Sequence, residues 1–142
     1  MDLATVLKSK GSNVVTIDAQ SSVREAVDML GERRIGALVV LDSGSVAGIM
    51  SERDVIYCLR QSGEAVLDWP VAKVMTAPVI TAEPSTPVLS ALALMTERRI
   101  RHLPVEHGGQ LVGIASIGDL VKHRMEQIEN EAQAMRSYIQ AV

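Results

Sequence analysis

The sequence of 142 residues predicts an α+β fold, layered, with two copies of one β-α-β-β-α unit. A short helix precedes the first copy and a long helix follows the second. Three observations predict this fold. A Gly-x-x-Ser-x-x-Asp motif occurs at Gly48 to Asp54 and again at Gly113 to Asp119, at one offset of 65 (113 − 48 and 119 − 54). Apolar stripes and β-branched runs keep the same offset without a gap, which indicates tandem duplication. A separate heptad pattern fills the C-terminus.

The first copy is predicted to span residues 14–62. It opens with a β-branched strand, and Ser22 begins a capping box that starts an amphipathic helix. An apolar strand at 37–41 and a return strand at 46–50 follow, joined by a turn rich in Ser and Gly. A second helix then starts at Asp54.

The second copy repeats these features over residues 79–122, with its first strand expected around 79–81. A linker of residues 63–78 separates the copies. Residues 1–13 form the lead-in, where Asp2 caps a short helix. These boundaries divide the chain into a lead-in, two repeats, a linker and a C-terminal helix.

The C-terminal helix, residues 123–142 with the turn before it, contains no Pro or Gly and carries an apolar seam. The seam consists of Val121, Met125, Ile128, Ala132, Met135, Ile139 and Val142. Spacings that alternate between four and three are typical of a heptad. Two interpretations stay open: the seam packs on the protein's own core, or it pairs with a partner, most simply the same helix of a second subunit.

The composition excludes several classes of function. A net charge of −3 is too acidic for a general nucleic-acid binder. The single cysteine, Cys58, excludes an internal disulfide or a cysteine metal cluster and is typical of a reducing cytoplasm. We expect no signal peptide, no membrane span and no metal site. There is no glycine-rich phosphate loop, and His102, His107 and His123 lack metal-ligand spacing, so no catalytic residue and no enzyme activity is predicted.

The two motifs, the run Arg101-His102-Leu103-Pro104-Val105 and the run Val74-Met75-Thr76 resemble a pair of cystathionine β-synthase (CBS) domains. The resemblance covers about residues 14–121 and is strongest to stand-alone bacterial CBS-pair proteins. It implies two repeats related by pseudo-two-fold symmetry, with their sheets face to face and two clefts between them. Each cleft is expected to hold an adenosine-containing ligand, namely AMP, ADP, ATP, NAD or S-adenosylmethionine. Such pairs often form homodimers.

The resemblance assigns ribose binding to Asp54 and Asp119. A carboxylate accepts two hydrogen bonds in a fork, which suits the cis hydroxyls of a ribose. The alternative is that both are simply helix N-caps. Ser51 and Ser116 either bond a phosphate or ribose oxygen or serve as turn and cap residues.

The resemblance also implies walls for the two clefts. Ile49 and Ile114 would press on the adenosine, or else belong to the core. The cleft of Asp119 would be walled by Ile35, Gly36 and Ala37, and that of Asp54 by Ile100, Arg101 and His102. Because Arg53 stands where the second copy has Gly118, the site at Asp54 is expected to be richer in cations. Whether Arg101 and His102 serve one cleft or both stays open.

The predicted function is therefore a cytoplasmic regulatory or signal-transduction module that binds adenine nucleotides and changes conformation or association. The alternative is a dimerisation or interaction scaffold that binds no ligand. A protein partner is also possible through the C-terminal helix.

Overall fold

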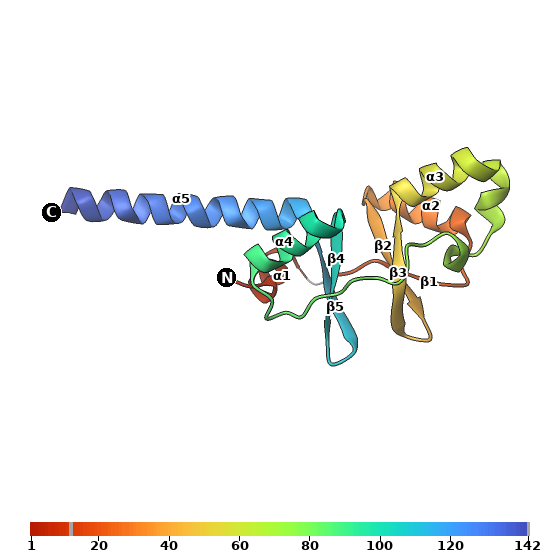
Figure 1. Ribbon diagram of the computed structural model, residues 1–142, viewed down its shortest axis with the longest axis horizontal. Helices are drawn as coiled ribbons and strands as arrows, with labels where there is room; N and C mark the ends of the chain where they lie inside the picture. The colour runs from red at the N-terminus through yellow and green to blue at the C-terminus, as the bar shows by residue number, and fades with distance from the viewer. Residues whose placement is uncertain (12, 142) are drawn as a thin grey trace.

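The computed structural model describes residues 1–11 and 13–141 and confirms the α+β fold of two repeats (Figure 1). The elements are α1 (Leu3–Lys10), β1 (Thr16–Asp18), α2 (Val23–Arg33), β2 (Ala37–Asp42), β3 (Ser45–Ser51), α3 (Glu52–Ser62), the 3₁₀ segments η1 (Gly63–Asp68) and η2 (Val71–Lys73), α4 (Val88–Arg98), β4 (His102–His107), β5 (Gln110–Ser116) and α5 (Ile117–Ala141). Figure 1 shows the two sheets in the middle of the molecule and the helices on their outer flanks. Both 3₁₀ segments lie in the linker between the repeats.

The two hairpins have the same hydrogen-bond register. β2 and β3 are antiparallel with a register shift after Val40, and β4 and β5 are antiparallel with a shift after Val105. These two positions differ by the offset of the repeat, 105 − 40 = 65. The duplication therefore extends to an irregularity of the ladder, which bends both hairpins in the same way.

The first strand of the second repeat is the main departure from the prediction. β1 pairs in parallel with β2, but its counterpart near residues 79–81 is no strand, and only a single bridge joins Ala82 to Val105. In the first repeat, the amide of Val39 donates to the carbonyl of Val15 at 3.4 Å. Pro104 stands at the position of Val39 and has no N–H to donate, so the parallel ladder is cut there.

Each repeat has its own hydrophobic core. The lead-in helix α1 packs into the core of the second repeat, and the linker packs into the core of the first. α1 buries Leu3, Val6 and Leu7 in the core of the second repeat. The linker residues Val66, Val71 and Val74 are buried in the core of the first. Each of these two segments therefore packs on the repeat that does not follow it in the sequence, and this packing connects the two repeats.

Gly48 and Gly113 allow these two segments to approach the sheets closely. A Cβ at Gly48 would lie 2.7 Å from the backbone oxygen of Thr76 in the linker. A Cβ at Gly113 would lie 2.6 Å from Cδ2 of Leu7 in α1. The glycine of the repeated motif is therefore explained by close packing, at both positions.

α5 leaves the body of the protein, and its outer half extends into solvent (Figure 1). Leu120 is fully buried, whereas the seam residues Val121, Met125, Ile128, Met135 and Ile139 are between 43% and 65% exposed. Within the described residues, the interpretation that the seam packs on the protein's own core is therefore wrong. Val142, the last residue of the predicted seam, lies outside the described residues.

Candidate functional site

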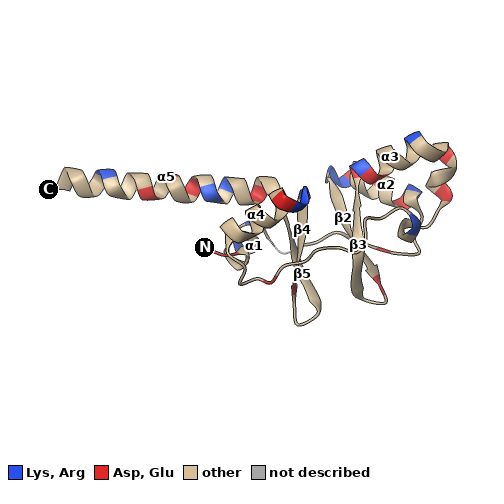
Figure 2. Ribbon diagram, viewed as in Figure 1, with Lys and Arg blue, Asp and Glu red and all other residues tan. Residues whose placement is uncertain are grey.

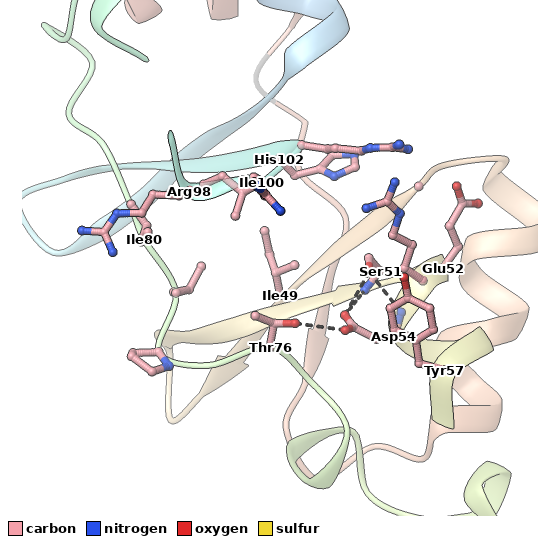
Figure 3. A pocket seen from close by; sticks show the side chains of 16 residues that line it. Ile49, Ser51, Glu52, Asp54, Tyr57, Thr76, Ile80, Arg98, Ile100 and His102 are labelled. Atoms are coloured by element: carbon pink, nitrogen blue, oxygen red, sulfur yellow. Dashed lines mark hydrogen bonds between the residues drawn. The ribbon is translucent and has the colours of Figure 1, made fainter. Parts of the chain in front are cut away.

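A cleft of ≈ 480 Å³ opens between the two repeats (Figure 3). It is lined by Gly36, Ile49, Ser51, Glu52, Arg53, Asp54, Tyr57, Thr76, Pro78, Val79, Ile80, Arg98, Arg99, Ile100, Arg101 and His102. The first repeat supplies the motif residues, the linker supplies Thr76, and the second repeat supplies the opposite wall. A ligand in this cleft would contact both repeats at once.

Asp54 lies in the first turn of α3 and does not start it. Ser51 is the N-cap: its hydroxyl accepts from the amide of Asp54 at 3.3 Å, and Asp54 Oδ2 accepts from the amide of Ser51 at 2.9 Å. The two side chains therefore cooperate in a capping box instead of competing for the same amides. The prediction that α3 starts at Asp54 was wrong: α3 begins at Glu52, two residues earlier, and its N-cap is Ser51.

Thr76 makes a further bond to this carboxylate. Its hydroxyl donates to Asp54 Oδ1 at 3.0 Å, while the hydroxyl of Ser51 donates to Oδ2, also at 3.0 Å (Figure 3). Two carboxylate oxygens offer about four lone-pair sites, and three donors occupy them here. Asp54 is thus held rigidly and still has an acceptor position on Oδ1.

Four arginines line the cleft, namely Arg53, Arg98, Arg99 and Arg101. Arg98 ends α4, and Arg99 is its C-cap with a left-handed φ of 55°. Both cations therefore lie at a helix C-terminus, where they suit the dipole. The same geometry brings them to the cleft.

Apolar side chains face each other across the same space. Figure 3 shows Ile49 of the first repeat on one side and Ile80 and Ile100 of the second repeat on the other. Tyr57, on α3, is 64% exposed and lies beside Asp54 (Figure 3). The cleft therefore combines an apolar middle, one carboxylate and a cationic rim.

His102 lines the cleft at Asp54, and its ring lies against Gly36 of the first repeat. Burial lowers the pKa of His102 below its ordinary value of 6.5. The cations Lys10 and Arg101 also lower this pKa, against the opposing carboxylates of Asp119 and Glu52. The charges that act on this pKa thus come from both repeats and from the lead-in residue Lys10.

Asp119 has a different environment from its twin. Lys10 Nζ donates to Asp119 Oδ2 at 2.5 Å and to the carbonyl of Ile114 at 2.9 Å. Ser116 and Asp119 form the same reciprocal cap as in the first repeat, at 2.9 and 3.0 Å. Burial would raise the pKa of Asp119, but the hydrogen bonds from Lys10 and Ser116 outweigh it and hold that pKa below 3.8. The second carboxylate is therefore already bound by a cation of its own chain.

Lys10 takes over the two hydrogen bonds that Thr76 makes in the other half. Thr76 donates its amide to the carbonyl of Ile49 at 2.8 Å and its hydroxyl to Asp54. Lys10 donates to the matching carbonyl, that of Ile114, and to Asp119. In both halves, the motif carboxylate and the carbonyl of the preceding Ile thus accept hydrogen bonds from one residue, which is Thr76 in the first half and Lys10 in the second.

The sequence itself carries a signal for this equivalence of lead-in and linker. The apolar residues of the lead-in recur in the linker at an offset of 68 (71 − 3, 74 − 6 and 75 − 7). Ala4 and Ala72 share the offset, and their amides donate to Pro84 and Ala19, which are themselves related by 65. Lead-in and linker are therefore part of the duplication.

The structure does not bring all predicted site residues to the cleft of Asp54. Gly36, which was predicted to wall the cleft of Asp119, lines the cleft of Asp54, and a Cβ there would lie 3.4 Å from the ring of His102. Of the other two residues predicted for the cleft of Asp119, Ile35 packs against the first core and Ala37 is buried. Ile114, Ser116 and Gly118 lie with Asp119 in the other half. The lining residues that sequence reasoning missed are Glu52, Tyr57, Thr76, Pro78, Val79, Ile80, Arg98 and Arg99.

Within residues 1–11 and 13–141, no helix combines the length and apolar character needed to cross a membrane. No group of three or more His, Cys, Asp or Glu side chains in the same ranges is arranged to hold a metal ion.

Comparison with known proteins identifies both repeats. The CBS domain pattern matches residues 9–61 and 71–126. The mitochondrial CBS domain-containing protein CBSX3 of Arabidopsis thaliana is 35% identical over 147 residues, which cover 97% of this chain and 71% of that protein. The CBS domain-containing protein YhcV of Bacillus subtilis is 27% identical over 123 residues, or 87% of each chain.

Solved structures share the arrangement. The CBS-domain containing protein ATU1752 from Agrobacterium tumefaciens has a TM-score of 0.83 and 39% identity, covering 87% of this chain and 99% of its own. The CBS domain pair of protein MJ0100, in complex with 5′-methylthioadenosine and S-adenosyl-L-methionine, has a TM-score of 0.79 and 24% identity, covering 89% and 98%. From the profile match, the relatives and the fold together, this chain belongs to the CBS domain family, as a tandem pair.

Proposed function

We propose that the chain is a regulatory module that binds an adenine nucleotide in the cleft at Asp54. The observation that carries the proposal is the joint lining of one cleft by Asp54 from the first repeat and by Ile100, Arg101 and His102 from the second. A volume of ≈ 480 Å³ lies in the range of small-molecule sites. The MJ0100 pair, which shares this fold, holds adenosyl ligands.

Each part of a nucleotide has a matching group. Asp54 keeps an acceptor position on Oδ1 for a ribose hydroxyl, beside the hydroxyl of Thr76. Ile49 and Ile100 offer apolar contact to the adenine ring. The guanidinium groups of Arg53 and Arg101 form charge-assisted bonds to phosphate. This cationic rim favours AMP, ADP, ATP or NAD over S-adenosylmethionine, whose sulfonium is itself a cation.

The signal would be a change in the arrangement of the repeats. Each repeat has its own core, so the angle between them can respond to a ligand that touches both. Such a ligand stabilises the arrangement in which both sets of contacts are made, by its differential affinity. No catalytic step is part of this proposal.

One nucleotide per chain is expected in the resting state. Asp119 is held by Lys10, whose ammonium must be displaced before a ribose can reach that carboxylate. Asp54 is held only by neutral hydroxyl and amide donors. We therefore assign the higher affinity to Asp54 and propose Asp119 as a second, weaker site.

The test is isothermal titration calorimetry of the full chain with AMP, ATP, NAD and S-adenosylmethionine. We expect binding of the phosphate-containing ligands with one site per chain. Asp54→Asn and Arg101→Ala should each weaken binding roughly 10- to 100-fold, because each removes a charge-assisted bond. Asp42→Asn, at the exposed end of β2, and Arg24→Ala, whose side chain is 57% exposed on α2, are matched controls and should bind normally.

Equal loss of affinity in the control variants would contradict the assignment of the cleft. No heat and no thermal shift with any of the four ligands at millimolar concentration would favour the scaffold function instead. Circular dichroism of Asp54→Asn separates loss of binding from loss of the capping box.

A further inference from the structure

The apolar seam of α5 is exposed over most of its length. Its large described members Val121, Met125, Ile128, Met135 and Ile139 are 43%, 65%, 48%, 60% and 65% exposed, and Ala132 between them is half-buried. A contiguous apolar strip of this kind is unusual on the surface of a monomer and marks an interaction surface. The seam runs along most of the 25 residues of α5.

The body of the protein contacts a different stripe of the same helix. Leu120 is buried, and His123, Arg124 and Gln127 are half-buried. At 3.6 residues per turn, this stripe is centred roughly 110° around the helix from the seam. The outer half of α5 lies beyond the body altogether (Figure 1). A helix in water is stabilised mainly by the packing of its apolar face. We therefore expect the seam to pack against a surface outside this chain.

We propose that the occupant is α5 of a second copy of this chain, in a parallel, in-register, two-stranded coiled coil. The seam places Met125, Ala132 and Ile139 at heptad position a, and Val121, Ile128 and Met135 at position d. The flanking e and g positions then carry the charges that set orientation (Figure 2). This inference is independent of nucleotide binding.

The charges favour the parallel arrangement. In a parallel pair, a g residue faces the e residue five positions later on the other helix. Arg124 at g therefore faces Glu129 of the second copy, and Glu131 at g faces Arg136 of the second copy. Within one chain, Arg136 already reaches Glu129 at 3.2 Å, but that pair is exposed and worth little, so it can exchange.

The antiparallel arrangement is disfavoured by the same residues. With the seams fully overlapped, Glu129 would face Glu129 and Glu131 would face Glu131 of the second copy. Lys122 would face Arg136. Like charges across an interface act against that register. Shifting the antiparallel register by one heptad toward the helix start replaces these contacts with opposite-charge pairs, Lys122 with Glu129 and Arg124 with Glu131. That register shortens the paired seam by a heptad, and the lost apolar contact counts against it.

Sedimentation equilibrium of the full chain at tens of micromolar tests the association. We expect Ile128→Glu combined with Met135→Glu to raise the dissociation constant roughly 100-fold or more, because charges would be buried without partners. Gln133→Glu combined with Ser137→Glu adds the same charge outside the seam and should leave it unchanged. Association that is unaltered by the seam variant, or a wild-type chain that is monomeric, would overturn the proposal and assign the seam to a helix of another protein.

A charge swap and a cross-link test the orientation. Arg124→Glu and Glu129→Arg should each weaken association, and the double variant should restore it. Ile128→Cys on a Cys58→Ser background should form a disulfide-linked dimer on mild oxidation, because in-register d positions face each other. Absence of rescue and of the cross-link in a chain that still dimerises through the seam would refute the parallel register.

Discussion

Replacing Lys10 tests the asymmetry between the two halves of the molecule most directly. Its ammonium contacts Asp119 Oδ2 at 2.5 Å and the carbonyl of Ile114 at 2.9 Å. Lys10→Met keeps the length of the apolar stem while removing the charge and the donors. Asp119→Asn keeps an acceptor for the amide of Ser116 while removing the charge.

The magnitude follows from the exposure of the pair. Hydrogen bonds to charged groups contribute about 1.5–3 kcal/mol, whereas fully exposed ion pairs contribute about 0–1 kcal/mol. The side chains of Lys10 and Asp119 are 34% and 28% exposed, so the pair lies between these limits. We expect Lys10→Met to lower the free energy of unfolding by about 1–2 kcal/mol, with a coupling of about 1 kcal/mol in the double-mutant cycle.

Urea denaturation of the wild type, both single variants and the double variant provides the assay. The pKa of Asp119 is lowered in the folded chain, so its charge contributes fully above the ordinary value of 3.8. That contribution is lost as the pH falls below 3.8 through the lowered pKa. The coupling should therefore be constant between pH 5 and 8, and a coupling near zero at pH 7 would refute the ion pair.

The same variant has a consequence for ligand binding, which rests on the proposed function. Removing Lys10 frees Asp119, so calorimetry should show a second nucleotide site per chain. A coupling of the expected size with only one site in Lys10→Met would mean that the ion pair exists but that the half at Asp119 binds no nucleotide.

Three further predictions concern the site and its supports. Gly48→Ala should destabilise the chain by about 2–3 kcal/mol and Gly113→Ala by about 1 kcal/mol. The new methyl group would meet the rigid backbone of Thr76 at Gly48 but only the flexible Leu7 side chain at Gly113. Equal losses of stability in urea denaturation would contradict this reasoning. Because the pKa of His102 is lowered in the folded chain, stability should rise with pH up to about 6.5, and His102→Gln should remove that slope. Ser51→Ala should cost about 1 kcal/mol through the lost cap of α3; an unchanged melting temperature would count against the capping box.

The periodicity of the residues alone predicted the duplication, the two repeated motifs and the heptad seam. Each motif and the seam are local patterns, because the Ser and Asp of a motif lie three residues apart and seam residues lie three or four apart. The wall formed by Ile100, Arg101 and His102 was expected from the family resemblance, and the structure brings these residues to the cleft of Asp54. Their contact with a nucleotide stays a prediction.

Only the tertiary structure decided how the halves complete each other. Nothing near Lys10 in the sequence points to Asp119, which lies 109 positions away. Thr76 reaches Asp54 because the linker folds back over the first repeat. Pro104 has no N–H to donate at a position where the first repeat makes a ladder hydrogen bond, so the first strand of the second repeat is reduced to a single bridge. These contacts join distant segments, so they depend on the packing of the whole chain and not on the pattern of any one segment.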